Sequence, residues 1–356
     1  MAFLRCFGYN VRRGGLTDVR VFAEGDKEDE SDNTIIAGST RYTSEELKKF
    51  TANFSNSNLI ACGGFSRVYL ANFPDSCPRA VKIMDGSSER LNRIYKQELD
   101  ILIQIKHDNI VKLLDHCDDD EFGNMLVFEY VSNGTLQDKL HENRDMTILP
   151  WRNRMAVAFQ LAQAIEYLHD KCPLQIVHSD IKSSNILLDD QFNCKLCDFG
   201  SAKIGFSSSV SPPTKNRVIL GSPGYTDPHY LRTGIASKKN DIYSFGVIIL
   251  ELISGVEAFS SGSGERLISK AAPILNDVSK VAEMMDPRLD RNYVLEEAKS
   301  MVSLAALCLS PEEQPAPSIS RYKTILRVKP DGWALDELTP SLGTAKVKNF
   351  RPLNCT

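Results

Sequence analysis

Two short polar clusters near the middle of the chain combine the residue types that phosphate-transfer chemistry requires. The first reads His178-Ser179-Asp180-Ile181-Lys182-Ser183-Ser184-Asn185, and the second reads Lys195-Leu196-Cys197-Asp198-Phe199-Gly200. The Asp180 carboxylate can orient a hydroxyl group, while Asn185 and Asp198 supply the oxygen ligands that Mg²⁺ prefers to nitrogen or sulfur. The two clusters therefore predict a magnesium-dependent phosphoryl-transfer site.

The order and spacing of these clusters resemble the catalytic loop and the Asp-Phe-Gly segment of eukaryotic protein kinases. The resemblance implies an α+β, bilobal protein kinase-like fold, with a small β-rich N-lobe that carries one main helix and a larger, mostly helical C-lobe. It implies ATP and Mg²⁺ as cofactors, catalytic roles for Asp180, Lys182 and Asn185, and metal binding by Asn185 and Asp198. Lys182 would neutralise charge on the transferred phosphoryl group, and its position resembles that in serine/threonine kinases.

Residues 60–69 stand where a kinase has its glycine-rich loop, a strand-turn-strand whose backbone amides approach the phosphates. Ala61 and Ser66 replace two of the three patterned glycines, while Gly63 remains with Gly64 beside it. Loss of one charge-assisted hydrogen bond, at roughly 1.5 to 3 kcal/mol, would weaken phosphate binding by about one to two orders of magnitude. The nucleotide-binding residues that the resemblance implies are Ile60, Ala61, Gly63, Gly64, Ser66, Val68, Ala80, Lys82, Glu98, Phe128, Glu129, Val131 and Leu187.

Lys82, in the alternating strand Ala80-Val81-Lys82-Ile83, matches the family's lysine that holds the nucleotide phosphates. Glu98 is its partner by position, and the pairing would aim Lys82 at the phosphates. Phe128 stands at the position that limits the pocket behind adenine. The backbone of residues 129–131 is expected to bind the base.

Other segments are expected to support these residues. Apolar residues at helical spacing from 151 to 169 predict an amphipathic helix that packs against the core of the large lobe. Asp241, which opens Asp241-Ile242-Tyr243-Ser244-Phe245-Gly246, matches the aspartate that braces the catalytic loop's backbone from a buried helix. His178 and Phe199 are interpreted as packing residues rather than catalysts.

Further segments look like plant receptor-like kinases of the Pelle type, and the match covers roughly residues 42 to 325. They are Glu45-Glu46-Leu47, Thr51-Ala52-Asn53-Phe54, Gly221-Ser222-Pro223-Gly224-Tyr225, Asp286-Pro287-Arg288-Leu289 and Leu307-Cys308-Leu309. Because neither an ectodomain nor a spanning helix is evident, the chain is most similar to the receptor-like cytoplasmic kinases. The resemblance implies protein substrates and membrane receptor kinases as partners.

Several positions depart from the family pattern. Ser179 replaces the arginine before the catalytic aspartate, which is typical of non-RD kinases, so an activation-segment phosphate would lack its main cationic partner. The element Asp227-Pro228-His229 lacks a glutamate, and the distant arginine that would pair with it is absent from residues 316–319. Two functions remain open: a working serine/threonine kinase, or a pseudokinase that acts as a nucleotide-binding or scaffold partner, motivated by Ala61, Ser66, Ser179 and His229.

Composition excludes several other classes of protein. The 356 residues are 42% hydrophobic and 25% charged, enough to bury one large core or two lobes. With 42 Lys+Arg against 46 Asp+Glu, the net charge of −4 does not favour nucleic acid as a partner. No apolar run is long enough to span a bilayer. Cys194 and Cys197 form a CxxC pair, but they lie in a short apolar strand, so core packing is favoured over redox or zinc chemistry.

The chain is expected to divide into an N-terminal tail at residues 1–41, a kinase domain at 42–325 and a C-terminal tail at 326–356. Within the domain, the N-lobe would cover about 42–131 and the C-lobe about 132–325. Thr43 followed by Glu46 reads as a capping box that opens a short helix at the domain's start.

The chain is expected to be cytoplasmic, with a possible association with the plasma membrane. Cys6, flanked by Phe3, Leu4 and Phe7, could carry a lipid anchor, although a plain tail cysteine is the open alternative. Candidate phosphorylation sites in the presumed activation segment are Ser207, Ser208, Ser209, Ser211, Thr214 and Ser222.

Overall fold

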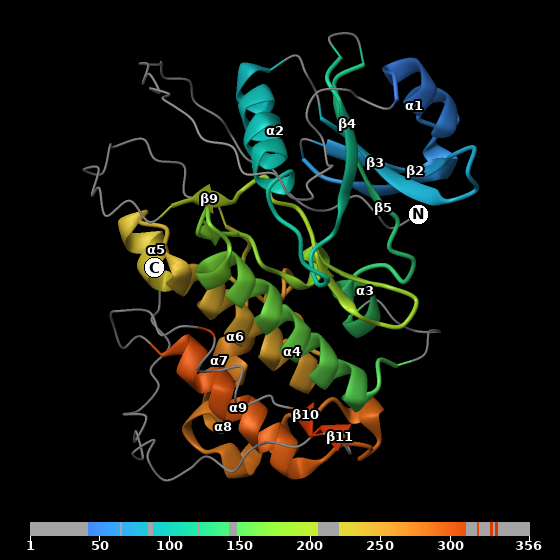
Figure 1. The fold of residues 1–356 in the computed structure, drawn as a ribbon. Coiled ribbons are helices and arrows are strands. Elements are labelled where there is room, and N and C mark those ends of the chain that lie inside the picture. Colours follow the sequence, from blue (N-terminus) through green and yellow to red (C-terminus); the bar gives the residue numbers. More distant parts are fainter. Residues whose placement is uncertain are drawn as a thin grey trace. The chain divides into compact units, whose positions relative to one another are not determined.

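A computed structural model describes residues 42–64, 66–84, 88–119, 122–141, 148–205, 221–310, 319, 328–329 and 332–333. The chain forms two compact units, which are described separately. The first comprises Met1–Arg93 with Leu113–Phe128, and the second comprises Ile94–Lys112 with Glu129–Thr356. Figure 1 labels the helices and most of the strands of the two units.

The first unit is built on an antiparallel sheet with the strand order β1-β2-β3-β5-β4. Strands β2 and β3 pair along their whole length, and Val68 lies opposite Lys82. From residue 68 to residue 72 of β2, buried positions alternate with more exposed ones, as a strand with one face on a core requires. The strands are β1 (Leu59–Cys62), β2 (Ser66–Asn72), β3 (Pro78–Met84), β4 (Leu113–Cys117) and β5 (Asn124–Glu129).

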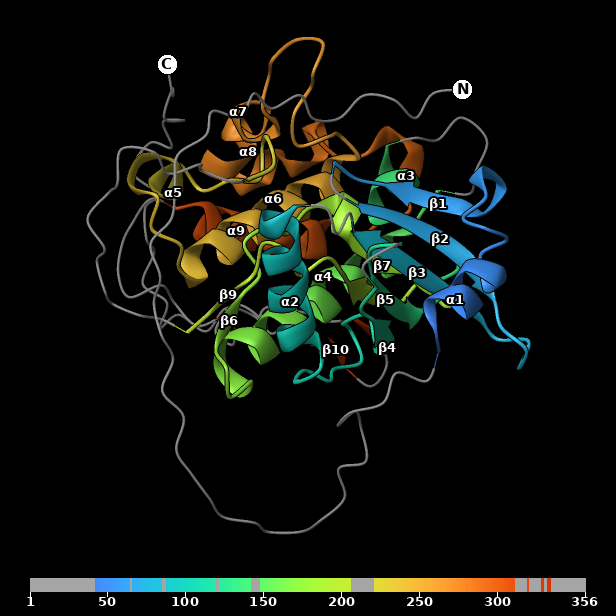
Figure 2. The ribbon, with the colours of Figure 1, turned by 90° about the horizontal axis from the view of Figure 1, so that it is seen from above.

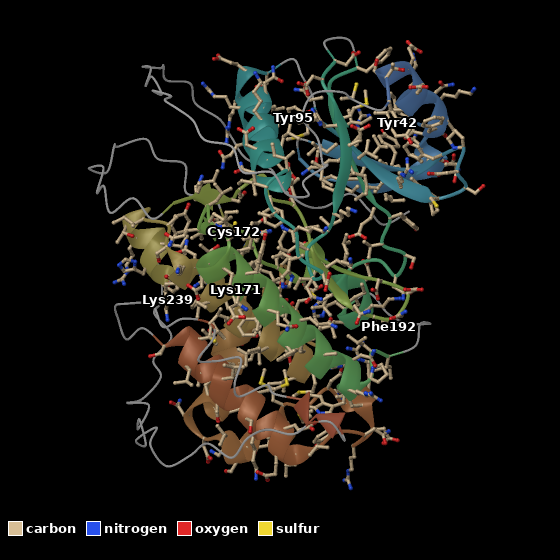
Figure 3. The ribbon with its side chains drawn as sticks, viewed as in Figure 1. Tyr42, Tyr95, Lys171, Cys172, Phe192 and Lys239 are labelled. Atoms are coloured by element: carbon tan, nitrogen blue, oxygen red, sulfur yellow. The ribbon has the colours of Figure 1, made fainter. Side chains whose placement is uncertain are left out.

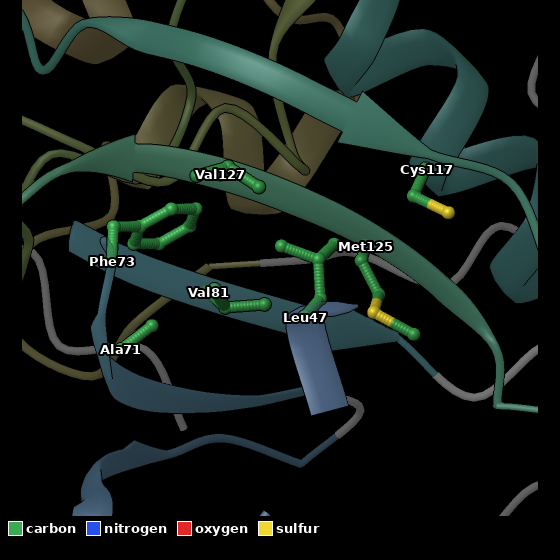
Figure 4. Packing of buried hydrophobic residues seen from close by; sticks show 7 residues of the cluster. All are labelled: Leu47, Ala71, Phe73, Val81, Cys117, Met125 and Val127. Carbon is green, nitrogen blue, oxygen red and sulfur yellow. The ribbon is translucent and has the colours of Figure 1, made fainter. Parts of the chain in front are cut away.

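Helix α1 (Ser44–Phe50) begins at the predicted capping box, which the structure confirms. The Thr43 side chain accepts from the Glu46 amide at 3.3 Å, and the Thr43 amide donates to the Glu46 carboxylate at 2.9 Å. Leu47, on the inner face of this helix, is fully buried in the sheet's core. Figure 4 shows its side chain among those of Val81, Met125 and Val127.

The second unit is mainly helical, and its central element is α6 (Lys238–Ser254). Every residue from 240 to 254 is buried, because the helix is apolar on nearly all sides. The other helices are α2 (Glu89–Leu102), whose first residues belong to the first unit, α3 (Leu136–Leu140), α4 (Trp151–Glu166), α5 (Pro228–Thr233), α7 (Leu267–Lys270), α8 (Ala272–Asn276) and α9 (Leu295–Leu309).

Helices α6 and α9 lie side by side, as Figures 1 and 2 show. A Cβ atom added to Gly246 of α6 would come within 2.8 Å of the Cβ atom of Cys308 in α9, so the glycine permits this close approach. Lys239, labelled in Figure 3, donates from Nζ to the carbonyls of Cys308 at 3.1 Å and Ser310 at 2.8 Å. Burial lowers the pKa of this ammonium. Lys239 thus caps the C-terminus of α9.

Short elements connect the helices. The helix expected over residues 151–169 is present as α4, followed by a π-helical turn, η2 (Tyr167–Lys171). The short strand pairs are β6 (Ile176–Val177) with β9 (Lys203–Ile204), β7 (Ile186–Leu188) with β8 (Cys194–Leu196), and β10 (Val328–Lys329) with β11 (Gly332–Trp333). The 3₁₀ turns are η1 (Asn56–Asn58), η3 (Ser183–Asn185), η4 (Val278–Glu283) and η5 (Pro287–Leu289). The last strand pair falls inside the segment predicted to be the C-terminal tail.

Cysteine placement agrees with the core-packing interpretation. Cys194 is fully buried in β8 and Cys197 is half-buried directly after it. Burial raises the pKa of the Cys194 thiol, so this group stays protonated. In the part of the chain that the structure describes, no helix has both the length and the apolar character needed to cross a membrane.

Candidate active site

The β7–β8 hairpin of the second unit brings the two predicted metal ligands to the same end of a ladder. Ile186 pairs with Leu196, so Asn185 and Cys197 flank the ladder just beyond this pair. The Cys197 amide donates to the Asn185 carbonyl at 3.0 Å. Because Asp198 follows Cys197, a backbone hydrogen bond ties the residue before Asp198 to Asn185.

Asp180 is surrounded by polar groups of the second unit. Its Oδ2 atom lies 2.9 Å from Lys182 Nζ, and its Oδ1 atom accepts from the Ser222 hydroxyl at 2.8 Å. The Asn185 amide donates to the Asp180 carbonyl at 2.9 Å and to Oδ2 at 3.3 Å. Lys182 Nζ also donates to the Ser222 hydroxyl at 3.1 Å, which closes a triangle of three side chains. These contacts hold the carboxylate in one orientation.

Asp241 of α6 braces the catalytic loop, as the sequence predicts. This fully buried carboxylate accepts from the backbone amides of His178 and Ser179, each at 2.8 Å, and it lies 2.8 Å from His169 Nε2. Hydrogen bonds to a charged group are each worth about 1.5–3 kcal/mol, so the loop is firmly attached to the central helix. Ser179 is held at a φ of 68°, in the left-handed region that non-glycine residues rarely adopt.

His178 and Phe199 are packing residues, as predicted. Both side chains are fully buried, and their rings meet edge to face with centroids 4.8 Å apart. His178 Nδ1 accepts from the Asp180 amide at 3.3 Å, and Nε2 lies 3.1 Å from the Cys197 carbonyl. Nε2 must therefore carry the proton, and the imidazole links the catalytic loop to the segment that precedes Asp198.

The donor set fits a magnesium ion by its chemistry. Both hydrogens of the Asn185 amide are directed at Asp180, which leaves the amide oxygen as the atom that can meet a cation. Asp198 adds a carboxylate to the donor set. Its backbone has a φ of 65°, in the left-handed region. A Cβ atom on Gly200 would lie 3.5 Å from both Asp198 Oδ1 and Glu98 Oε2, so both carboxylates lie next to this glycine. Mg²⁺ commonly takes only one or two protein oxygens and completes its shell with phosphates and water.

Four residues predicted to bind the nucleotide belong to the second unit: Glu98, Glu129, Val131 and Leu187. The Glu129 amide already donates to the Lys112 carbonyl at 3.1 Å, and the Glu129 side chain accepts from Lys195 Nζ at 3.0 Å. Val131 is buried, and its amide and carbonyl make no backbone hydrogen bond with the residues that the structure describes. Leu187 is half-buried in β7. Val131 thus has the backbone groups that could meet a base.

The other predicted nucleotide-binding residues belong to the first unit. Lys82 and Ala80 are buried in β3, and Phe128 is buried in β5. The predicted phosphate loop is far more open, and the side chain of Ile60 is 45% exposed. This group comprises Ile60, Ala61, Gly63, Gly64, Ser66, Val68, Ala80, Lys82 and Phe128. Glu98 is fully buried in the part of α2 that belongs to the second unit, and its pairing with Lys82 stays a prediction.

The sequence predictions missed the role of Ser222, which was considered only as a phosphorylation site. Ser222 is 7% exposed, and its hydroxyl connects Asp180 with Lys182. Its position in the segment Gly221-Ser222-Pro223-Gly224-Tyr225 was the available signal. The other candidate phosphorylation sites, Cys6, and residues 316–318 lie outside the residues that the structure describes.

Asp227 opens the element Asp227-Pro228-His229, in which His229 departs from the family pattern. Asp227 Oδ1 accepts from the His229 amide at 3.0 Å and caps α5, while its buried Oδ2 has no partner among the described residues. A small cavity, about large enough for one water molecule, is lined by Asp227 together with Ser179, Tyr230 and Asn240, among others. A water there would satisfy the orphaned oxygen.

Comparison with known proteins agrees with this geometry. Residues 54–324 match the protein kinase domain. Over 306 residues, which are 82% of this chain and 88% of the relative, the sequence is 51% identical to a probable receptor-like protein kinase of Arabidopsis thaliana. It is 42% identical to salt tolerance receptor-like cytoplasmic kinase 1 of Oryza sativa subsp. japonica, over 91% of this chain and 92% of that protein.

The match to the kinase domain covers both units, and the two relatives are similar over most of their own length. The sheet of the first unit and the helices of the second agree with the two lobes of a kinase fold. The chain therefore belongs to the protein kinase family, among the receptor-like kinases of plants.

Proposed function

We propose that this chain is an active serine/threonine protein kinase that transfers the γ-phosphoryl group of Mg-ATP to hydroxyl groups of protein substrates. The observation that carries the proposal is the hydrogen bond from the Ser222 hydroxyl to Asp180 Oδ1 at 2.8 Å. The Asp180 carboxylate thus already accepts a hydrogen bond from an alcohol, the kind of interaction that it would make with a substrate hydroxyl. The proposal is also supported by the Lys182 ammonium, which lies beside the oriented Asp180 carboxylate.

Each residue of the catalytic loop has a distinct role in this proposal. Asp180 orients the substrate hydroxyl and accepts its proton as the oxygen attacks. Lys182, 2.9 Å from Asp180, offsets the negative charge that gathers on the transferred group. Asn185 and Asp198 would hold the metal ion, which supplies charge neutralisation at the phosphates when it is bound.

The proposed nucleotide-binding roles follow from membership of the kinase family. In the first unit, Lys82 would bind the phosphates and Phe128 would limit the depth of the adenine pocket. In the second, the backbone of residues 129–131 would bind the base. Ala61 and Ser66 replace two of the three patterned glycines of the phosphate loop, so a high KM for ATP is expected.

The domain boundaries and the cellular partners are also proposals. Residues 42–325 would form the kinase domain, with tails on either side. Membrane receptor kinases are the proposed partners, in line with the resemblance to receptor-like kinases, and the two relatives are named a receptor-like protein kinase and a receptor-like cytoplasmic kinase. Cys6 could carry a lipid anchor, and membrane fractionation of a Cys6→Ser variant tests this, since unchanged partitioning would remove the anchor from the proposal.

A direct test measures magnesium-dependent ATP turnover and phosphorylation of a generic protein substrate, with Asp198→Ala as the matched variant. Wild type should be active and the variant should lose at least about 100-fold in kcat. Equal silence of two folded proteins would instead favour the alternative, a pseudokinase scaffold, for which Ala61, Ser66, Ser179 and His229 are the motivation. Nucleotide binding with and without Mg²⁺ then shows whether such a scaffold still binds ATP.

A further inference from the structure

A buried carboxylate lies in α6, ten residues after the brace Asp241. Glu251 is 0% exposed and collects donors from several elements. The Tyr225 hydroxyl lies 2.8 Å from each of its two oxygens. Oε1 also accepts from His141 Nε2 at 2.9 Å, from the Ala258 amide at 3.3 Å and from the Ser183 hydroxyl at 3.4 Å. An ionised group buried this deeply requires a cation as its partner.

His141, at the end of α3, is the cation that lies within hydrogen-bonding distance of Glu251 among the described residues. Its side chain is 3% exposed. Nε2 faces the Glu251 carboxylate, and Nδ1 lies 3.3 Å from the Gly255 carbonyl. An ionised Glu251 carboxylate and the Gly255 carbonyl are both acceptors, so both ring nitrogens must donate to them, and only the doubly protonated imidazolium has two donors. The geometry therefore assigns a positive charge to His141.

The same carboxylate anchors two segments on either side of Asp180. Tyr225 lies three residues after Ser222, and Ser183 directly follows Lys182 in the catalytic loop. The hydroxyls of Tyr225 and Ser183 are 2.8 Å apart, so Glu251, Tyr225 and Ser183 form one connected network. Burial and the neighbouring Glu251 carboxylate raise the pKa of Tyr225 well above its ordinary value, which keeps its hydroxyl a donor.

We propose that His141 is a cationic positioning residue, which neutralises Glu251 and thereby holds Tyr225 and Ser183 in the arrangement that places Ser222 and Lys182 against Asp180. The inference rests on the proposed kinase activity, which it deepens. Without the imidazolium, Glu251 would be a buried charge with only neutral donors. Such a charge draws in water or moves toward solvent, and the Tyr225 segment would move with it.

Other charged groups near His141 are already paired with one another. Arg288 donates to Asp286, and its Nη2 also donates to the Leu140 carbonyl beside His141 at 2.6 Å. A Cβ atom on Gly255 would lie 2.4 Å from Asp286 Oδ2, which places this pair against the carbonyl that His141 contacts. Arg154 donates to the same aspartate. Both arginines contact Asp286 rather than Glu251, whereas the basic side chain that contacts Glu251 in the described part of the chain is His141.

The activity test is a double-mutant cycle of His141→Gln and Glu251→Gln with a serine peptide as substrate. His141→Gln should lower kcat/KM for the peptide by at least about 10-fold, mainly through KM, and leave the KM for ATP within about 2-fold. The double variant, in which two neutral amides face each other, should recover to within about 3-fold of wild type. His116→Gln, a half-buried histidine of β4, is the matched control and should be neutral.

Two kinetic results would overturn the proposal: a His141→Gln enzyme with wild-type peptide kinetics, or a double variant no better than His141→Gln. Far-UV circular dichroism and the thermal midpoint of each variant show whether a loss is simply unfolding. If the variants unfold, the imidazole resonances of the wild-type protein decide the question. NMR across about pH 5.5–9 should show His141, assigned by its absence from His141→Gln or by isotope labelling, protonated at neutral pH.

The NMR measurement does not depend on catalysis, so it separates the two proposals. A neutral His141 at pH 7 would overturn the positioning role even in a fully active kinase. A protonated His141 in a protein without ATP turnover would remove the proposed kinase function, and the peptide's dissociation constant would then decide the role of the network. The His141→Gln variant should weaken peptide binding by about 10-fold, and unchanged binding would count against the inference.

Discussion

Replacing Asp286 with alanine should destabilise the protein more than most single changes. Asp286 is 2% exposed, and it is the anionic partner of Arg154, whose side chain is fully buried. The guanidinium donates to the carbonyls of Leu149 and Leu252, each at 2.9 Å, and to Asp286 Oδ2 at 2.7 Å. This cation is poorly solvated because it is 0% exposed, and burial lowers the pKa of Arg154. Removing the carboxylate leaves it without a counter-charge.

The expected loss follows from this burial. Breaking a buried pair by removing one partner costs about 3–5 kcal/mol, against a total stability of about 5–15 kcal/mol for a typical domain. Arg288 also loses its partner, but its side chain is 31% exposed and can turn to solvent. We therefore expect about 4 kcal/mol from Asp286→Ala, almost all of it due to Arg154.

Urea unfolding followed by tryptophan fluorescence measures this loss. Asp286→Ala should shift the transition midpoint strongly, whereas Glu283→Ala, an exposed carboxylate of the same region, should stay within about 0.5 kcal/mol of wild type. The double variant Arg154→Met with Asp286→Ala should lose less than Asp286→Ala alone, because no orphan charge remains. A loss below about 1 kcal/mol for Asp286→Ala, with an unchanged slope, would refute the reasoning.

The pair also makes stability depend on pH in a defined direction. Burial alone would raise the pKa of Asp286, but the hydrogen bonds from Arg288 and Arg154 lower it below the ordinary value of 3.8. The folded state therefore binds the proton less readily than the unfolded chain. The contribution is complete above pH 3.8 and is lost as the pH falls through the lower, native value. In the Asp286→Ala variant, the free energy of unfolding should therefore depend less steeply on pH in acid than it does in the wild type.

Three further changes test other parts of the structure. Leu47→Ala should cost about 2–5 kcal/mol by leaving a cavity in the core beneath the sheet, measured by urea unfolding, and a change below about 1 kcal/mol would contradict the burial of this side chain. Gly246→Ala should cost about 1–3 kcal/mol, measured by thermal unfolding, because its methyl group would overlap α9; an unchanged midpoint would mean that the helices separate easily. Ser222→Ala should lower kcat/KM by about 10-fold or more while Ser222→Thr retains activity, and equal kinetics in a peptide assay would remove the Asp180 contact from the mechanism.

Local signals in the sequence predicted a large part of the molecule. The capping box at Thr43 and Glu46 needs only neighbouring residues, and its geometry is as expected. Asn185 and Asp198 are joined by a short hairpin, so their approach at the end of the β7–β8 ladder follows from local pairing. Asp241 was predicted through its resemblance to a family motif, and its hydrogen bonds to the catalytic loop confirm that prediction.

The contacts that sequence reasoning missed join residues far apart in the chain through single polar atoms. Ser222 is 42 residues from Asp180, and His141 is 110 residues from Glu251. Hydrophobic periodicity predicts which faces of helices and strands are buried, but it does not tell which buried polar group meets which. Glu251 interrupts an otherwise apolar helix, so the sequence already contained a carboxylate in need of a partner. That this partner is His141, at the end of α3, depends on how α3 and α6 pack, and no local sequence pattern encodes that packing.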